Sequence, residues 1–436
     1  MRMRYDAVEA ASFPDHPKAL APFKPSNNKR LYLAKLRDLL YNIRCVHEEA
    51  RSMKFAQKKI SRWVLICLPV LIPAMAATAD AQVPPGIAAG LHKIGQIVDP
   101  ACTAKLYRPL MPKNDYNDYW PLGASAPANP APLYPGVTIA RDVSFGPHPK
   151  DLVDIFSPDK GTENRTVLIY VSGGGGNKIE QQDREANAFY DNIGRWAVKN
   201  DMIAVTMQRH PGENWDDGGK DVAMMIQWLQ ANIAKYKGNP DRMFIWAHSA
   251  GNGPLGVYIG HPELHGPKGP GVKGAIFMSG NPVPGITGPP APVAGAPNPL
   301  ADAGKVCGVA DGAGPNATAG AISGPSSVKT AGGARGGARG AQPVDAATQA
   351  ARSNLPGFKS TKVAIVLARA ELDPGVNGDM LPADIALHDE MCKAGKEHCP
   401  TMLFLKGESH MSEVFSIDTD DKTVSGPILA WIKKVK

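Results

Sequence analysis

Residues 241–256 read Asp-Arg-Met-Phe-Ile-Trp-Ala-His-Ser-Ala-Gly-Asn-Gly-Pro-Leu-Gly, and this stretch decides the fold. An apolar run at 243–247, typical of a buried strand, is followed at once by Ser249 and then by small residues. A serine on a sharp turn between a strand and a helix needs small residues two positions before and after it, and Ala247 and Gly251 hold these positions. The stretch therefore predicts a nucleophilic serine, with a helix N-terminus directed at a developing oxyanion. The alternative is a chance small-His-Ser-small-Gly string in a chain with 45 glycines.

Length and charge narrow the class of protein. The 436 residues are 43% hydrophobic, which is ample for a large core, and α/β folds often use about 250–300 residues for one domain. The net charge of +7 arises entirely from residues 1–81, so residues 82–436 are neutral overall. A neutral body without a basic stripe argues against nucleic acid as a partner.

The N-terminal segment predicts export. From Met53, four basic residues precede an apolar run at 63–77 and a small-x-small site at 79–81, which is the pattern of a signal peptide cleaved before Gln82. We expect translation to begin at Met53, with residues 1–52 an over-extended start. The mature protein is then secreted or periplasmic, without a stable membrane anchor. A cytoplasmic tail before a membrane anchor and a lipoprotein modified at Cys67 are the alternatives.

Four cysteines remain after residue 82, an even number that suits disulfides in an exported chain. Cys392 and Cys399 are close enough in sequence to pair, which leaves Cys102 for Cys307, although four cysteines allow three pairings. Zinc binding by the cysteines and His398 is disfavoured because CxxC spacing is absent. No metal or cofactor is predicted.

Strand and helix patterns alternate along the chain. Residues 82–135 predict an arm packed on the surface, and 136–436 the main domain. An antiparallel hairpin is expected at 137–145 and 152–156, further strands at 166–171, 202–208, 243–247, 272–279, 362–368 and 401–405, and helices at 182–200, 221–236, 385–396 and 428–435. Strands that are apolar on both faces indicate a mostly parallel sheet with helices on both sides. The low-complexity segment 283–355 predicts a disordered insertion between the sixth and seventh strands.

Three side chains with complementary chemistry follow strand ends in the order Ser249, Asp373, His410. The carboxyl ends of parallel strands share one edge of a sheet, so these residues are expected to meet. An imidazole can take the serine proton near neutral pH, and a carboxylate holds the imidazole in the required tautomer. Glu371 is the alternative acid. The alternative bases are His210, His248, His261, His265, His388 and His398.

A glycine run, Ser172-Gly-Gly-Gly-Gly-Asn177, follows the predicted strand at 166–171. Glycines let backbone N–H groups turn into a cavity without side chains in the way. Gly173, Gly174 and Ala250 are the expected donors to an oxyanion. Phosphate binding is less favoured because GxxxxGK[ST] is absent, and a flexible turn is the third possibility.

The chain from residue 142 onward, without the insertion, resembles the secreted bacterial branch of the α/β-hydrolase superfamily, the carboxylesterase- and lipase-like enzymes. The resemblance rests on Arg-Asp-Val-Ser-Phe-Gly at 141–146, Asn-Pro-Asp-Arg at 239–242 before His-Ser-Ala-Gly at 248–251, His-Pro-Glu at 261–263, and Ser-His-Met-Ser-Glu at 409–413. It implies the α/β-hydrolase fold. Two departures stand out, since Ala247 replaces the usual first glycine of the elbow and Ser172 replaces the histidine that usually opens the glycine run and braces it.

These features together predict a serine hydrolase that cleaves a carboxylic ester of a small or medium substrate through an acyl-enzyme. An amidase or formamidase with the same triad is one alternative. A catalytically inactive hydrolase fold that serves as a binding protein is another, and Ser172 and Ala247 favour it.

Overall fold

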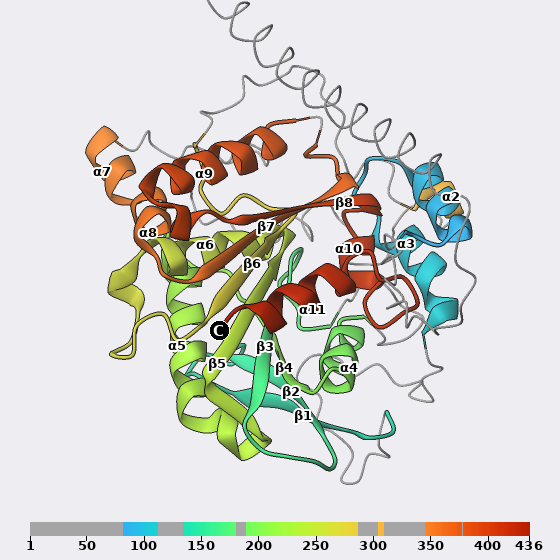
Figure 1. Cartoon of the computed structure of the whole chain (residues 1–436), viewed down its shortest axis with the longest axis horizontal. Helices are drawn as coiled ribbons and strands as arrows, with labels where there is room; N and C mark the ends of the chain where they lie inside the picture. Colours follow the sequence, from blue (N-terminus) through green and yellow to red (C-terminus); the bar gives the residue numbers. More distant parts are fainter. Residues whose placement is uncertain (1–81, 112–133, 180–188, 287–303, 309–344, 377) are drawn as a thin grey trace, which may run out of the picture. The chain divides into compact units, whose positions relative to one another are not determined.

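A twisted sheet of eight strands forms the centre of the molecule (Figure 1). The computed structural model describes residues 82–111, 134–179, 189–286, 304–308 and 345–436 except 377, all within one compact unit, Ala77–Lys436. The predictions for residues 1–81, including the signal peptide, lie outside the described residues.

The strand order is β1-β2-β4-β3-β5-β6-β7-β8. The strands are β1 (Val137–Ser144), β2 (Leu152–Pro158), β3 (Arg165–Val171), β4 (Met202–Met207), β5 (Gly238–His248), β6 (Gly274–Met278), β7 (Ala364–Leu372) and β8 (Thr401–Ser409). β2 pairs antiparallel with β1 and with β4, whereas all later pairs are parallel. The α/β fold class, the opening hairpin and the position of the insertion after the sixth strand are confirmed.

Helices cover both faces of the sheet because its strands are apolar on both sides. Leu168 and Tyr170 face one core together with α4 (Asp191–Lys199) and α11 (Ser425–Lys434). Val167 and Ile169 face the other core, which is closed by four further helices. These are α5 (Asp217–Asn232), α6 (Asn252–Gly260), α8 (Leu355–Ser360) and α9 (Met380–Ala394). The alternation of strand residues between two cores is the period-two pattern of a doubly covered sheet.

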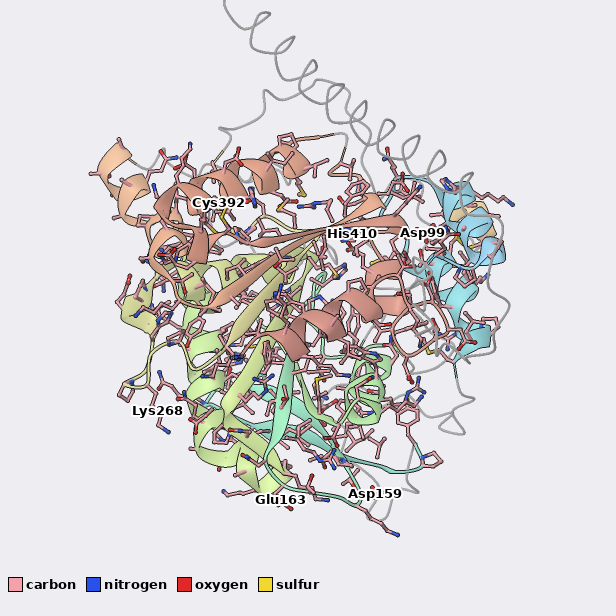
Figure 2. All side chains as sticks on the ribbon, viewed as in Figure 1. Asp99, Asp159, Glu163, Lys268, Cys392 and His410 are labelled. Carbon is pink, nitrogen blue, oxygen red and sulfur yellow. A yellow bond between two sulfur atoms is a disulfide. The ribbon has the colours of Figure 1, made fainter. Side chains whose placement is uncertain are left out.

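The expected surface arm is wrong for residues 82–111, which form two helices that reach the core. Asp99 caps α3 (Pro100–Tyr107) by accepting the N–H of Cys102 at 2.9 Å (Figure 2). Proline at the first turn also suits α2 (Pro85–Ile94) and α3, since its missing N–H has no helical partner there. Leu91 and Tyr107 are fully buried. Apolar residues of α2 and α3 therefore belong to the hydrophobic core.

Both predicted disulfides are confirmed, Cys102–Cys307 and Cys392–Cys399. The first one ties α3 to the described residues 304–308 of the low-complexity segment. A short helix, α7 (Ala346–Ala351), also lies within that segment, so the expected disorder is wrong for these parts. Residues 287–303 and 309–344 lie outside the described residues. Over the described part of the chain, no helix has both the length and the apolar character to cross a membrane.

Candidate active site

Ser249 lies on a strained turn directly after β5. Its φ of +53° is in the left-handed region, where residues other than glycine are uncommon and strain is usually functional. Only glycine fits two positions later, since a Cβ at Gly251 would lie 2.4 Å from the carbonyl oxygen of Val171. Asn252 holds the turn by donating through Nδ2 to the carbonyls of Ser249, at 2.8 Å, and Met278, at 2.9 Å. The elbow predicted from the sequence is present, with Ala247 fully buried at its first small position.

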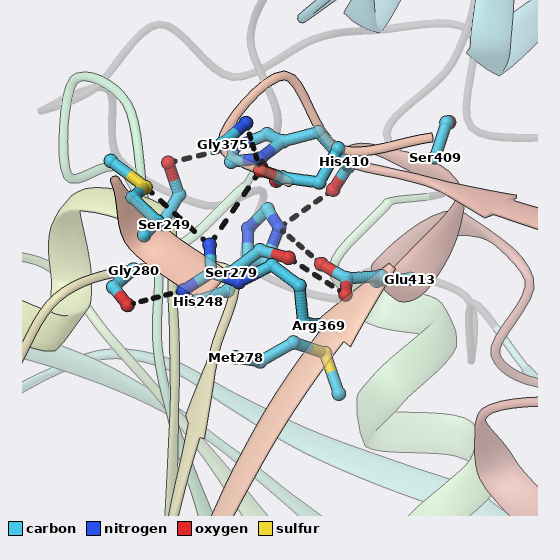
Figure 3. Close-up of polar contacts among 12 residues, drawn as sticks. His248, Ser249, Met278, Ser279, Gly280, Arg369, Gly375, Ser409, His410 and Glu413 are labelled. Atoms are coloured by element: carbon cyan, nitrogen blue, oxygen red, sulfur yellow. Dashed lines mark hydrogen bonds and ion pairs between the residues drawn. The ribbon is translucent and has the colours of Figure 1, made fainter. Parts of the chain in front are cut away.

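The structure brings the three predicted residues together at the carboxyl edge of the sheet. Nε2 of His410, just after β8, lies 2.8 Å from Oγ of Ser249 (Figure 3). Nδ1 of the same ring lies 2.5 Å from Oδ2 of Asp373, which follows β7. An imidazole bound on one side by a carboxylate and on the other by a hydroxyl can move a proton from the serine.

The carboxylate of Asp373 is fixed in its ionised form. Burial raises its pKa, but His410, Arg369 and the N–H of Gly375 together lower it to about 2. The Gly375 N–H donates to Oδ1 at 2.6 Å, and Nη1 of Arg369 lies 3.6 Å from the same oxygen. Arg369 is held in turn by Asp384, 2.8 Å from Nη2, and by the carbonyl of Gly280 at 2.9 Å. Asp373 therefore stays negative throughout the range in which His410 would act.

His248, the residue before the serine, ties the elbow to the loop that carries His410. Its Nε2 lies 2.8 Å from the carbonyl oxygen of His410. A carbonyl only accepts, so Nε2 carries the proton and donates. Burial, followed by the nearby ring of His410, lowers the pKa of His248 to about 3, and the ring is neutral at ordinary pH. His248 is therefore a positioning residue in this geometry and does not contact the serine as a base.

A buried carboxyl group, that of Glu413, lies behind His248. Burial raises the pKa of Glu413 well above its ordinary value, with the charge of Asp373 adding to the effect. Oγ of Ser279 donates to Oε1 of Glu413 at 2.8 Å, and Oε2 lies 3.5 Å from Nε2 of His248 (Figure 3). The raised pKa of Glu413 favours its neutral form, in which it adds no negative charge beside that of Asp373.

The predicted oxyanion loop lies directly against the serine. A Cβ at Gly173 would lie 2.6 Å from Cβ of Ser249, so no side chain fits there. Gly174 has φ +48°, which favours glycine. Ala250 follows the serine at the start of the helical turn Ser249–Gly251, which leads into α6. The structure thus groups the three predicted donor residues around Ser249, while their role toward an oxyanion remains a prediction.

Arg209 braces this loop, which the sequence analysis did not anticipate. Its Nε donates to the carbonyl of Ser172 at 2.8 Å, and Nη2 to those of Gly173 and Gly174 at 3.1 and 3.3 Å. Burial lowers the pKa of Arg209 to about 10, which still leaves a cation at neutral pH. The guanidinium thereby stands in for the histidine whose place Ser172 takes. The only signal in the sequence is an arginine directly after a buried strand.

The alternative acid and bases are engaged elsewhere. Glu371 accepts the N–H of Gly407 at 2.8 Å through Oε2. The ring contacts of the remaining histidines are His210 with Asp151, His261 with Glu263, His265 with the carbonyl of Tyr258, His388 with Asp389, and His398 with the carbonyl of Thr361.

The part of the chain that matches a known protein family includes the elbow at Ser249. Residues 153–261 match the BD-FAE family model. The acylcarnitine hydrolase of Mus musculus is 33% identical over 96 residues, which are 19% of this chain and 16% of that protein. The para-nitrobenzyl esterase of Bacillus subtilis (strain 168) is 24% identical over 127 residues, 26% of this chain and 25% of that protein. The chain thus spans about a quarter or less of the length of these curated relatives.

Among solved structures, carboxyl esterase 2 from the mycorrhizal fungus Tuber melanosporum is similar, with a TM-score of 0.45 at 14% identity, over 69% of this chain and 88% of that one. A carbohydrate esterase from gut microbiota has a TM-score of 0.44 at 13% identity, over 68% of this chain and 95% of that one. The sheet order, the elbow at Ser249 and the match of residues 153–261 to the BD-FAE family model together support an α/β-hydrolase fold similar to that of carboxylesterases.

Proposed function

We propose that the protein is a serine hydrolase that cleaves carboxylic esters of small or medium size through an acyl-enzyme. One observation carries this proposal, the continuous chain of contacts from Ser249 Oγ through His410 to Asp373, at 2.8 and 2.5 Å. The para-nitrobenzyl esterase of Bacillus subtilis (strain 168) is among the relatives, which supports ester hydrolysis as the reaction class.

In the first half of the reaction, Oγ of Ser249 attacks the ester carbonyl while Nε2 of His410 takes the hydroxyl proton. Asp373 stabilises the imidazolium that forms. The negative charge on the carbonyl oxygen is stabilised by the backbone N–H groups of Gly173, Gly174 and Ala250. The C–O bond to the alcohol then breaks, and His410 returns its proton to the departing oxygen.

In the second half, water replaces the alcohol. His410 removes a proton from the water, whose oxygen attacks the acyl carbon, and the acid leaves as Ser249 regains its proton. Each proton taken by the imidazole is returned, so the enzyme is regenerated unchanged.

The protein is further proposed to act outside the cytoplasm, in the periplasm or the medium. Its two disulfides support this, because such bonds persist in oxidising compartments. N-terminal sequencing of the exported protein tests this part, with a start at Gln82 expected and an intact Met1 contradicting it.

The proposal is tested with Ser249→Ala and short-chain p-nitrophenyl esters. We expect turnover to fall by on the order of 10⁴–10⁶-fold, as when the nucleophile of a triad is removed. Ser360→Ala is the matched control, because Ser360 is an exposed serine at the end of α8. A fluorophosphonate probe should label the wild type and the control at Ser249. Unchanged turnover in Ser249→Ala would remove the serine from the mechanism.

The same assay separates the alternative reactions. Matched aryl esters and anilides are compared, and an ester hydrolase prefers the ester far beyond the difference in their uncatalysed reactivity. An equal preference would point to amide cleavage. Folded protein that no fluorophosphonate labels would point to a binding protein without catalysis.

A further inference from the structure

A second cluster of polar side chains, separate from the triad, lies on two loops and one helix. His148 and Asp151 belong to the loop between β1 and β2, His210 follows β4, and Asp221 is on α5. One ligand atom from each of His148, Asp151 and His210 lies within 4.8 Å of the other two. Asp221 adds a carboxylate oxygen 3.2 Å from Nε2 of His210.

Nε2 of His210 lies between two carboxylates. Its Nδ1 lies 3.2 Å from the carbonyl oxygen of Pro211, and in the tautomer with its proton on Nδ1 the ring donates there and leaves Nε2 able to bind a metal. Nε2 then faces Oδ1 of Asp151 and Oδ2 of Asp221, each at 3.2 Å. In that tautomer three electron-pair donors converge, and a cation between them would be coordinated by all three. A metal-bound histidine commonly has its second nitrogen bonded to a backbone carbonyl in this way.

Two of the contacts in this cluster have the spacing of ligand atoms in a tetrahedral metal site. Zinc–nitrogen and zinc–oxygen bonds of about 2.0–2.1 Å place neighbouring ligand atoms about 3.3 Å apart. Both contacts of His210 Nε2 have nearly this length, 3.2 Å. The exposed ring of His148 stacks on that of His210 with centroids 4.0 Å apart, and its Nδ1 accepts the N–H of Lys150 at 3.1 Å, so His148 would have to turn its ring to bind the same ion through Nε2.

The carboxylate of Asp151 is fixed before any ion binds. It is 1% exposed, and its Oδ2 accepts the N–H of His148 at 2.8 Å, which leaves Oδ1 directed at His210. A Cβ at Gly146 would lie 2.4 Å from Oδ2, so the glycine of the hairpin loop makes room for this carboxylate.

We propose that His148, Asp151 and His210 bind a divalent transition metal of the zinc type, with Asp221 as the fourth ligand. Imidazole nitrogens and carboxylate oxygens are ligands that such a borderline-soft ion prefers, and two carboxylates balance its charge of +2. The metal would join the β1–β2 loop to the β4–α5 loop and to α5. Because Arg209, which braces the glycine loop, is the residue before His210, the metal also fixes one end of that brace. The site does not depend on the proposed ester hydrolysis.

The test uses the full chain without an affinity tag, with its disulfides intact and stripped with EDTA. Calorimetric titration with Zn²⁺ is expected to show one equivalent bound, and the melting temperature should rise until that equivalent is reached. Addition of Co²⁺ should produce the strong visible absorption of a tetrahedral cobalt site. Mg²⁺ in excess should not displace either ion.

Variants assign the signal to these residues. His148→Ala and His210→Ala should each weaken Zn²⁺ binding by more than the about 10–100-fold that loss of an outer-shell partner costs. His92→Ala, which removes an exposed histidine of α2, should bind like the wild type. His148 is exposed, so its metal-free variant should melt like the metal-free wild type, which separates loss of binding from loss of folding. Undetectable Zn²⁺ binding by the wild type, or wild-type affinity in both histidine variants, would overturn the proposal.

Discussion

Nε of Arg209 donates to the carbonyl oxygen of Ser172 at 2.8 Å, and this contact fixes the start of the glycine loop against Ser249. The resemblance implied a bracing histidine within the loop itself, and Ser172 takes its place here. Here the bracing residue, Arg209, follows the neighbouring strand β4, and its Nη2 donates to two further carbonyls, those of Gly173 and Gly174. The glycines of this loop have no side chains that could hold it, and the buried guanidinium of Arg209 holds it through its backbone carbonyls.

The first prediction concerns this brace. Arg209→Lys keeps the charge but loses the planar fork, so the loop should sample positions in which its N–H groups miss the oxyanion. We expect kcat for p-nitrophenyl esters to fall by about 10–100-fold with little change in KM. Arg242→Lys is the control, because Arg242 also donates to two backbone carbonyls, those of Ile432 and Val435, away from Ser249. Equal losses in the two variants would mean that Arg209 acts through stability alone.

The second prediction concerns His248 and pH. The pKa of His248 is lowered to about 3, so the ring does not titrate between pH 5 and 9. Glutamine also offers a neutral N–H, and His248→Gln should lower kcat by no more than about tenfold while the shape of the pH–rate profile stays that of the wild type. His248→Ala loses the donor to the His410 carbonyl and should lose more. An acid limb that moved in His248→Gln would show that His248 itself titrates during catalysis.

The third prediction concerns Glu408, which is fully buried beside Asp421. Burial, with the charge of Asp421 next, raises the pKa of Glu408 well above its ordinary value. A carboxyl with a raised pKa in the folded state stabilises fully below its unfolded pKa of about 4.5, and this contribution is lost as pH rises through the folded value. Glu408→Gln removes the titration, so the fall in unfolding free energy from pH 5 to pH 8 should shrink by about 1 kcal/mol or more.

Denaturant titrations at several pH values measure this change. Glu397→Gln is the control, since the side chain of Glu397 is 76% exposed, and its pH dependence should match the wild type. If Glu408→Gln kept the wild-type dependence of unfolding free energy on pH, another buried group would carry the proton.

The fourth prediction compares the two disulfides. Cys102–Cys307 spans 205 residues and Cys392–Cys399 spans 7. Closing the longer loop removes more entropy from the unfolded chain, so replacing both cysteines by alanine should cost about 5 kcal/mol for the long loop and about 2 kcal/mol for the short one. Melting temperatures of the two double variants measure the difference. A larger loss from the short loop would show that native packing outweighs chain entropy here.

The features that short stretches of sequence determine, such as the elbow and the residues that follow strands, were predicted. The elbow at Ser249 is specified within five residues, because tight packing admits only small neighbours at Ala247 and Gly251. Asp373 and His410 were predicted from their position after strands, since a parallel sheet gathers such residues at one edge. Helix boundaries were less accurate, and α5 begins at Asp217, four residues before the apolar pattern starts.

Residues that act across the fold could not be predicted in this way. Arg209 contacts a loop 35 to 37 residues earlier in the chain, and nothing in the local pattern of either segment names the other. The helices α2 and α3 were missed although Asp99-Pro100 is a good helix start, because proline and alanine outweighed it in the composition. His148 and His210 meet only after β2, β3 and β4 have formed, so no sequence spacing reveals them.

The bond between Cys102 and Cys307 makes a covalent ring out of more than two hundred residues, with Ser249 inside it and Asp373 and His410 beyond it. A protease that cuts the backbone once anywhere within this ring releases no fragment, because both pieces stay joined through sulfur. Nicked protein would keep its full mass on a non-reducing gel and separate only after reduction. After a first cut within the ring, such a closure keeps Ser249 covalently joined to the part of the chain that carries Asp373 and His410.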